Sequence, residues 1–235
     1  LPLLLPIKGR AMTELAIADR DTPWPVTRII CIGRNYREHA REMGHNPERA
    51  TPFFFFKPAT ALLAHGEVFT CPWFSKEVHH ELELVIAIDQ TLQGANEQQA
   101  REAVSGFAVG LDMTCRDIQR EAKAEGRPWE LAKGFDGSAP CSALQLGRYR
   151  DLEATDRLTL TRNGTIVQQG SWRDMIWSVP ELISELSRYI TLAPGDLLFT
   201  GTPAGVGPVQ PGDQLVATLD DFCELSVTVA EQLSA

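Results

Sequence analysis

The stretch that decides the fold spans residues 79–86 and reads HHELELVI. Leucines alternate there with Glu81 and Glu83, a pattern typical of a β-strand. Successive side chains of a strand point to opposite faces, so both glutamates share one face and the leucines occupy the other. Carboxylates seldom lie in such apolar runs unless something offsets the cost of removing them from water. The stretch therefore predicts a strand with one apolar face and one face that carries two carboxylates.

A third carboxylate, Asp112, follows the apolar run 107–111, which reads FAVGL. Three carboxylates with open coordination positions suit a hard divalent cation such as Mg²⁺ or Mn²⁺. Plainer interpretations stay open at this point. Glu81 and Glu83 also fit a half-exposed strand with a wet face, and Asp112 also fits a turn or a hydrogen-bonded core position.

The composition is that of an ordinary globular protein. The chain has 235 residues, 43% of them hydrophobic and 23% charged, and this length can form one domain with a sizeable core. The net charge of −9 argues against a nucleic acid or an anionic membrane as the main partner. An anionic substrate would therefore need local positive charge, from a metal ion or from well-placed Lys and Arg side chains.

Five cysteines are scattered along the chain, and none forms a Cys-x-x-Cys pair. This pattern favours free thiols in a reducing compartment, and we expect a cytoplasmic protein. Cys71 with His79 and His80 is a weak zinc candidate, because the spacing matches no common zinc motif.

The first residues indicate a lead-in to the domain. Residues 1–6 read LPLLLP, which is too short to span a membrane and lacks the basic start of a signal peptide. Met12 is a candidate for the natural start. We expect an N-terminal extension and lead-in over residues 1–27 and a single domain over residues 28–235.

Expected strands outnumber helices, without the regular alternation of parallel α/β folds. The Asn163-Gly164 pair predicts a hairpin over 157–167, and Asn96 and Ser178 are candidate helix caps. Residues 52–58 contain four successive phenylalanines and are expected to form a core strand. Further strands are expected at 28–32, 67–72 and 81–89, and helices at 37–43, 96–104, 178–190 and from 114 onward. These elements predict an α+β fold that is mainly β, with a few peripheral helices.

His39 and Glu42 are three residues apart in the segment 37–43. On a helical turn they share a face, so the carboxylate can orient the imidazole and stabilise its positive charge. Such a pair makes a good general base for activating water. The same segment also fits a charged surface helix held by salt bridges, because most of its residues are charged.

Two further segments carry candidate chemistry. Lys133 lies in the mostly apolar stretch 129–136, where it could stabilise a developing negative charge or move a proton. It also fits a surface lysine whose stem alone is buried. Residues 200–207 read TGTPAGVG and follow an apolar strand, but they lack the lysine of a P-loop. This loop favours a small carboxylate, bound by backbone N–H groups, over a nucleotide.

In combination, these motifs resemble the fumarylacetoacetate hydrolase family, and most closely its short single-domain acylpyruvase branch, which is fumarylpyruvate hydrolase-like. They run in the family's order from about residue 28 to the end of the chain. The motifs that carry the resemblance are 33–36 (GRNY), His39, 79–84 (HHELEL), 110–114 (GLDMT), 116–117 (RD), 129–133 (WELAK) and 201–207 (GTPAGVG).

The resemblance implies a mixed β-sandwich roll of the family's C-terminal type, which holds Mg²⁺ or Mn²⁺. The metal ligands that it implies are Glu81, Glu83 and Asp112. The catalytic residues that it implies are Lys133 and the water-activating pair His39 and Glu42, on a segment that orders over the substrate. The substrate contacts that it implies are Arg34, Arg116, Gln119 and Thr202. Longer two-domain members add a fourth carboxylate ligand, which has no counterpart here, so water is expected in its place.

The implied activity is hydrolysis of the C–C bond of acylpyruvates, such as fumarylpyruvate or acetylpyruvate. The alternative is decarboxylation, tautomerisation or isomerisation of oxaloacetate or a related oxo-diacid, because fold resemblance does not choose among these reactions. A non-catalytic binding protein on this fold is disfavoured by the carboxylate trio with Lys133. The expected partners are a small 2-oxo acid substrate and, from the resemblance, a second copy of the chain in a homodimer.

Overall fold

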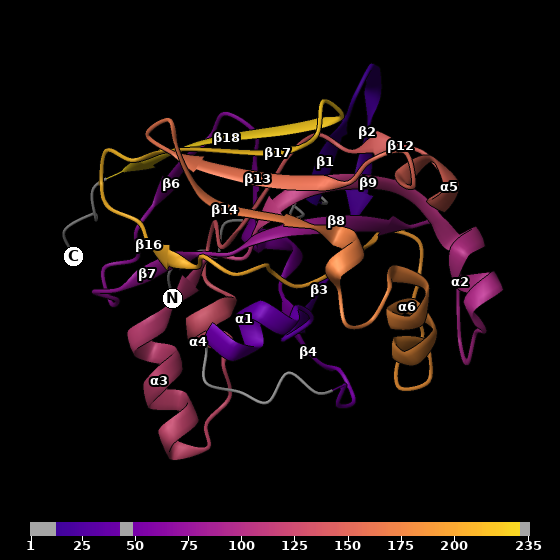
Figure 1. Ribbon diagram of the computed structural model, residues 1–235, viewed down its shortest axis with the longest axis horizontal. Coiled ribbons are helices and arrows are strands. Elements are labelled where there is room, and N and C mark those ends of the chain that lie inside the picture. Colours follow the sequence, from indigo (N-terminus) through magenta and orange to yellow (C-terminus); the bar gives the residue numbers. More distant parts are fainter. Residues whose placement is uncertain (1–12, 43–48, 231–235) are drawn as a thin grey trace, which may run out of the picture.

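The computed structural model describes residues 13–42 and 49–230. Its centre is a mixed eight-stranded sheet in the order β4-β3-β15-β8-β9-β11-β5, with β12 beside β9 (Figure 1). In this large sheet β15 is parallel to β3 and β11 is parallel to β5, whereas the other neighbours are antiparallel. Its strands are β3 (Arg28–Gly33), β4 (Phe53–Lys57), β5 (Leu62–Ala64), β8 (Leu82–Ile88), β9 (Val104–Leu111), β11 (Ala139–Cys141), β12 (Gln145–Leu146) and β15 (Asp196–Phe199).

A five-stranded sheet in the order β14-β13-β17-β18-β6 packs over the large sheet (Figure 1). Its strands are β6 (Val68–Thr70), β13 (Arg157–Arg162), β14 (Thr165–Ser171), β17 (Gln214–Leu219) and β18 (Cys223–Ala230). A small sheet is formed by β7 (Val78–His80), β10 (Thr114–Cys115) and β16 (Gly207–Pro208), and a hairpin by β1 (Thr13–Ile17) and β2 (Arg20–Val26).

The main core fills the space between the two larger sheets. Leu84 and Ile86 of β8 belong to one apolar cluster with Val109 of β9, Leu158 of β13 and Leu225 of β18, and all five are fully buried. The alternation seen in residues 79–86 thus aims every second side chain into the sandwich. The strand predicted there is confirmed.

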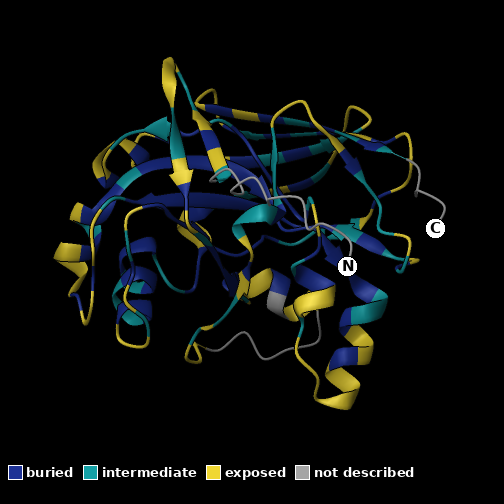
Figure 2. Cartoon of the chain, turned by 180° about the vertical axis from the view of Figure 1, so that it is seen from behind, coloured by how far each residue is buried: buried dark blue, intermediate teal, exposed yellow. Residues whose placement is uncertain are grey.

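The opposite face of the large sheet is covered as well. Val85 and Ala87 of β8 pack with Leu15 of the β1-β2 hairpin and Phe199 of β15 in a second apolar cluster. Every residue of β8 is therefore buried, and Figure 2 shows the central strands in dark blue along most of their length. The interpretation of a half-exposed strand with a wet face is wrong, because a second layer of chain covers the face that carries Glu83.

The helices lie at the margins of this sandwich (Figure 1). On the side of the large sheet that faces away from the five-stranded sheet lie α1 (Arg37–Glu42), α3 (Arg116–Glu125) and α4 (Glu130–Lys133), whereas α2 (Glu97–Ala103) and α6 (Val179–Ser187) pack together at one end. Three shorter helices are η1 (Ala59–Ala61), α5 (Tyr149–Leu152) and η2 (Trp172–Asp174). Over the described ranges, no helix is both long enough and apolar enough to cross a membrane.

The predicted α+β fold, mainly β with peripheral helices, is confirmed. The caps at Asn96 and Ser178 are confirmed by capping boxes, and the hairpin turns at Asn163 and Gly164, which both have positive φ as a two-residue turn requires. Residues 1–12, including Met12, and residue 43 lie outside the described residues.

One expected core element is wrong. The phenylalanine run forms β4, but β4 is an edge strand of the large sheet, and 36% of Phe53 and 43% of Phe56 are exposed. Only one long side of an edge strand pairs with a neighbour, so fewer of its side chains are enclosed. The buried member of this segment is instead Lys57, which is 1% exposed.

A single buried amide, that of Gln168 on β14, joins the layers. Its Oε1 accepts hydrogen bonds from the Leu82 backbone N–H (3.0 Å) and from His80 Nδ1 (2.8 Å). Its Nε2 donates to Thr202 Oγ1 (2.9 Å) and to the Pro203 carbonyl (3.0 Å). Because the Leu82 N–H can only donate and the Pro203 carbonyl can only accept, the amide oxygen must face Leu82 and the amide nitrogen must face Pro203. Gln168 thus ties the five-stranded sheet to β8 and to the loop after β15.

We expect Gln168→Ala to lower the free energy of unfolding by about 2–4 kcal/mol, because several buried polar groups lose their partner at once. Gln169→Ala, the exposed neighbour on the same strand, is the matched control and should change stability by less than about 0.5 kcal/mol. Urea denaturation followed by circular dichroism measures both variants. A loss for Gln168→Ala no larger than that of the control would contradict the bridging role.

Candidate active site

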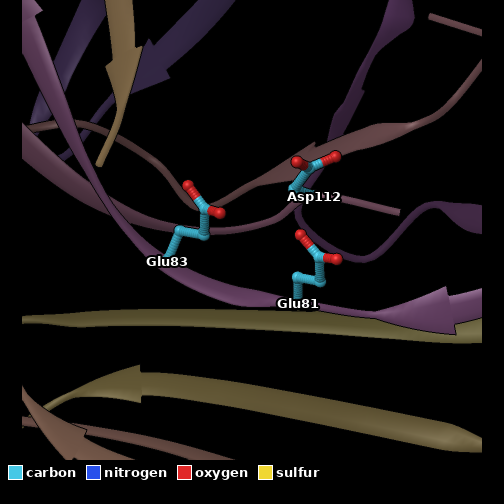
Figure 3. Close-up of side chains that lie close together, drawn as sticks. All are labelled: Glu81, Glu83 and Asp112. Carbon is cyan, nitrogen blue, oxygen red and sulfur yellow. The ribbon is translucent and has the colours of Figure 1, made fainter. Parts of the chain in front are cut away.

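Three carboxylates meet where β8 begins and β9 ends. Glu81 directly precedes β8 and Asp112 directly follows β9, and the Asp112 N–H donates to the Glu81 carbonyl (2.8 Å). Glu83 pairs with Gly110, whose lack of a side chain leaves Glu83 no cross-strand side-chain neighbour. The three side chains point into one space (Figure 3), and each offers an oxygen within 4.8 Å of the others. The sequence alone did not show that the strands beside these carboxylates are neighbours; the structure does, because β8 pairs with β9.

Burying three carboxylates together is costly, and three cations offset the cost. Lys133 Nζ donates to Glu81 Oε2 (2.9 Å) and to Asp112 Oδ2 (2.7 Å). Arg116 Nη2 donates to Glu81 Oε1, and Lys57 Nζ lies 2.8 Å from Asp112 Oδ1. Lys133 is 3% exposed, so the interpretation of a surface lysine with a buried stem is wrong.

The pKa values of the two glutamates move in opposite directions. Burial alone raises the pKa of Glu81, but Lys133 and Arg116 outweigh it and hold that pKa well below its ordinary range. Burial raises the pKa of Glu83, and repulsion from Asp112 and Glu81 raises it further. The two pKa values differ because the glutamates have different partners: among the described residues, Glu83 accepts a hydrogen bond from the Gly201 backbone N–H alone (2.9 Å), whereas Glu81 is paired with two cations.

The carboxylate trio fits a divalent cation on chemical grounds. Asp112 Oδ1 is buried, and Lys57 approaches it in an ion pair without the direction of a hydrogen bond, so no described residue donates one to it. An oxygen left in this state is available as a ligand. The donor set is all oxygen, which suits Mg²⁺ or Mn²⁺ better than a soft metal.

The His39–Glu42 pair stands beside this trio. His39 Nδ1 lies 3.2 Å from Glu42 Oε2, so the other ring nitrogen, Nε2, is the one left for proton transfer. His39 is 7% exposed and lines the same cleft as the carboxylates. The interpretation of α1 as a charged surface helix therefore holds for Glu42, whose side chain is 37% exposed, but not for the buried His39.

Two backbone N–H groups of the glycine-rich loop bind carboxylates of this chain, and binding of a free small carboxylate by the loop stays a prediction. The Gly201 N–H donates to Glu83, and the Gly205 N–H donates to Glu42 Oε1 (3.2 Å). Backbone amides of this loop therefore hold Glu83 of the carboxylate trio and Glu42, the partner of His39. Gly201 and Gly205 have φ of +100° and +96°, a conformation that side chains beyond glycine rarely adopt.

A cleft of about 460 Å³, partly open to solvent, gathers the predicted site residues. Gln119 accepts a hydrogen bond from Arg116 Nη1 (2.8 Å) on the same face of α3, which leaves the Gln119 amide nitrogen free to donate. The predicted residues that line the cleft are Arg34, His39, Glu81, Glu83, Asp112, Arg116, Gln119, Lys133 and Thr202. Glu42 stands outside the lining and reaches it through His39.

Sequence reasoning missed several members of the site. Lys57 was passed over, although a lysine that ends a run of four phenylalanines is a signal of a buried charge. Phe53, Phe55 and Trp129 form an apolar wall of the cleft. Gln168, which bonds Thr202, lies in the hairpin far along the chain, and its local sequence carries no signal for this role.

The zinc candidate is wrong. Among the residues that the structure describes, the only group of three metal-type ligands that close together is Glu81, Glu83 and Asp112. His80 is bonded to Gln168 instead, because β7 turns its side chain toward the hairpin. All five cysteines are free thiols, as expected.

Comparison with solved structures finds close neighbours. The crystal structure of fumarylpyruvate hydrolase from Pseudomonas aeruginosa, in complex with Mn²⁺ and pyruvate, superposes with a TM-score of 0.91 at 43% identity, over 98% of this chain and 99% of that one. A 5-carboxymethyl-2-hydroxymuconate delta-isomerase from Mycobacterium smegmatis superposes with a TM-score of 0.80 at 31% identity, over 90% of this chain and 82% of that one.

Sequence comparison agrees. The oxaloacetate tautomerase YcgM of Escherichia coli is 42% identical over 199 residues, which cover 84% of this chain and 90% of that protein. The human mitochondrial oxaloacetate tautomerase FAHD1 is 39% identical over 201 residues, with 86% and 90% covered. Residues 28–230 match the model of the fumarylacetoacetate (FAA) hydrolase C-terminal domain. The chain therefore belongs to the fumarylacetoacetate hydrolase family, whose members include hydrolases, tautomerases and isomerases.

Proposed function

We propose that the chain is a divalent-cation-dependent hydrolase that cleaves the C3–C4 bond of acylpyruvates to pyruvate and a carboxylic acid. The observation that carries the proposal is the His39–Glu42 pair, which lies in one cleft with the carboxylate trio and Lys133. Hydrolysis needs a base for water, whereas the other reactions of the family's 2-oxo acids do not. The neighbour that binds Mn²⁺ and pyruvate supports it, since pyruvate is a proposed product.

Glu81, Glu83 and Asp112 would hold the cation, as Mg²⁺ or Mn²⁺. When bound, it would polarise the carboxylate and 2-oxo oxygens of the substrate and stabilise negative charge that develops there. Arg116 and the Gln119 amide nitrogen can donate hydrogen bonds to one end of the substrate, and Thr202, whose hydroxyl accepts a hydrogen bond from Gln168, lines the same cleft. The 2-oxo acid head would thus be oriented by groups from α3 and from the glycine-rich loop.

The remaining steps fall to side chains. His39 takes a proton from a water molecule, whose oxygen attacks the C4 carbonyl, and Glu42 stabilises the imidazolium that forms. The C3–C4 bond then breaks, and its electron pair passes to C3 and is shared with the 2-oxo oxygen. Lys133 lies where it can stabilise this charge. The proton that His39 took from the water is then delivered to C3, which completes pyruvate and restores the neutral imidazole, and the acyl part leaves as a carboxylic acid.

A second candidate is tautomerisation or decarboxylation of oxaloacetate. It is favoured by the two relatives named oxaloacetate tautomerases, which are 39% and 42% identical. Tautomerisation moves one proton between C3 and the 2-oxo oxygen and needs no water, so Lys133 and the trio would carry it alone.

The homodimer and the cytoplasmic location stay predictions.

We expect Glu83→Gln to weaken Mn²⁺ binding by about tenfold or more, because the trio loses a charged ligand, while the fold is retained. Isothermal titration of Mn²⁺ into the protein measures this without reference to turnover. Glu224→Gln, on the exposed face of β18, is the control and should bind as the unaltered chain does. Activity that survives exhaustive EDTA treatment would contradict a metal-dependent mechanism.

We expect the chain with Mg²⁺ to consume acetylpyruvate and fumarylpyruvate, as followed by loss of their ultraviolet absorbance and release of pyruvate. Oxaloacetate is assayed in parallel for enol–keto exchange and for release of CO₂. Fast exchange of oxaloacetate with no cleavage of either acylpyruvate would replace the hydrolase by the second candidate.

The His39 base should separate the two reactions. His39→Ala should lower kcat/KM for acylpyruvate cleavage by about 10²-fold or more, the scale of general-base loss. The oxaloacetate reactions should fall less, because the trio and Lys133 remain. Glu38→Ala, an exposed neighbour on α1, is the matched control. Equal losses for both substrates in His39→Ala would mean that the residue serves a step common to both.

A further inference from the structure

Two cations of the cleft have no anionic partner among the residues that the structure describes. Lys57, Lys133 and Arg116 are paired with the carboxylate trio, whereas Arg34 and Lys123 make no hydrogen bond or ion pair with any described residue. Both line the cleft, and both are exposed at its mouth. The deep end of the cleft is therefore a balanced set of charges, and its mouth carries unpaired positive charge.

These two cations stand on one aromatic wall. The Arg34 guanidinium carbon lies 5.4 Å from the centre of the Phe53 ring, and Lys123 Nζ lies 5.0 Å from that of Trp129. Phe53 and Trp129 contact each other edge to face, with ring centres 5.6 Å apart, and Phe55 continues the wall. The rings hold the two side chains without neutralising them, so the charges stay available to a ligand.

The positions of the two residues carry further marks of a binding role. Arg34 lines the cleft with a φ of +61°, which costs energy in a residue other than glycine. Burial, and then the nearby Arg116 and Arg34 guanidinium groups, lower the pKa of Lys123. Positive charges thus crowd one another at the mouth, and an anion bound between them would relieve that repulsion.

Helix α3 sets the distance between the two ends of the cleft. Arg116, Gln119 and Lys123 share one face, and Lys123 lies seven residues beyond Arg116, about 10 Å along the helix axis. An acylpyruvate whose 2-oxo acid head lies by Arg116 would extend its acyl arm along the aromatic wall. A carboxylate at the end of that arm would reach the unpaired cations.

We propose that Arg34 and Lys123 bind the distal carboxylate of a dicarboxylic substrate, so that the site selects 2-oxo acids with a second anionic end. This inference rests on the proposed function for the orientation of the substrate. The aromatic wall suits a flat, conjugated linker between the two acid groups, because planar groups stack on rings. An uncharged acyl group would leave both cations without a partner.

The test compares two probes that differ only at the distal end. 2-Oxoheptanedioate and 2-oxoheptanoate have the same seven-carbon chain length as fumarylpyruvate, but only the first has a second carboxylate. In the presence of Mn²⁺, isothermal titration should show about tenfold tighter binding of 2-oxoheptanedioate, the scale of charge-assisted contacts at a partly exposed site. In Lys123→Gln this preference should fall to about twofold or less, and Lys123→Arg should restore it.

Arg34→Asn should reduce the preference in the same way, because asparagine tolerates positive φ and so removes the charge without disturbing the backbone. Arg120→Gln is the control, since it removes a positive charge from the same helix outside the cleft, where Arg120 pairs with Glu77. Its preference for 2-oxoheptanedioate should match that of the unaltered chain.

The outcomes separate this inference from the proposed function. An unaltered chain that binds both probes equally, or a Lys123→Gln variant that keeps the full preference, would overturn the proposal that Arg34 and Lys123 bind the distal carboxylate. Kinetics give a second readout, in which Lys123→Gln raises KM for fumarylpyruvate more than for acetylpyruvate. If no acylpyruvate is cleaved at all, the hydrolase proposal fails. The binding preference between the two probes still tests whether Arg34 and Lys123 bind a distal carboxylate.

Discussion

The burial of three carboxylates in one space is the constraint on which the rest of the structure depends. Oxygens no more than 4.8 Å apart repel by roughly 3.5 kcal/mol or more per pair at an effective dielectric constant near 20. Lys133, Arg116 and Lys57 offset this repulsion in part. Glu83, whose hydrogen-bond partner among the described residues is the Gly201 backbone N–H, keeps a raised pKa, and the proposed cation would relieve the remaining repulsion.

Each compensating charge comes from a different part of the chain, so the fold and the site form together. Lys57 ends the edge strand β4, Arg116 begins α3, and Lys133 ends α4. The Lys57 ammonium also donates to the Met113 carbonyl (3.2 Å) and to the Lys133 carbonyl, so it positions the segments that carry Asp112 and Lys133. Removing any one of these elements would leave a buried carboxylate without its partner, which costs more than the pair contributes when intact.

The sequence predicted what repeats locally and missed what depends on long-range contact. The alternation around Glu83 identified a strand and its faces, and the capping boxes identified two helices, because these signals lie within a few residues. The role of Lys57 and the exposure of the phenylalanine run depended on which strand lies at the edge, a property of the whole sheet. Gln168 shows the same limit, since its four partners are 34 to 88 positions away.

In the proposed mechanism, the choice among reactions is made outside the carboxylate trio. The trio and Lys133 can serve any reaction that places negative charge on a 2-oxo acid, and they alone would not distinguish cleavage from tautomerisation. Hydrolysis additionally needs His39 at a fixed place, and its partner Glu42 is held by the Gly205 N–H of the same loop whose Gly201 N–H holds Glu83. The glycine-rich loop therefore couples the base to the acidic site through two backbone hydrogen bonds. Because α1 is short and carries the proposed base His39 outside the sandwich, the proposed mechanism implies that small changes in α1 or in the loop alter the reaction while the trio stays the same.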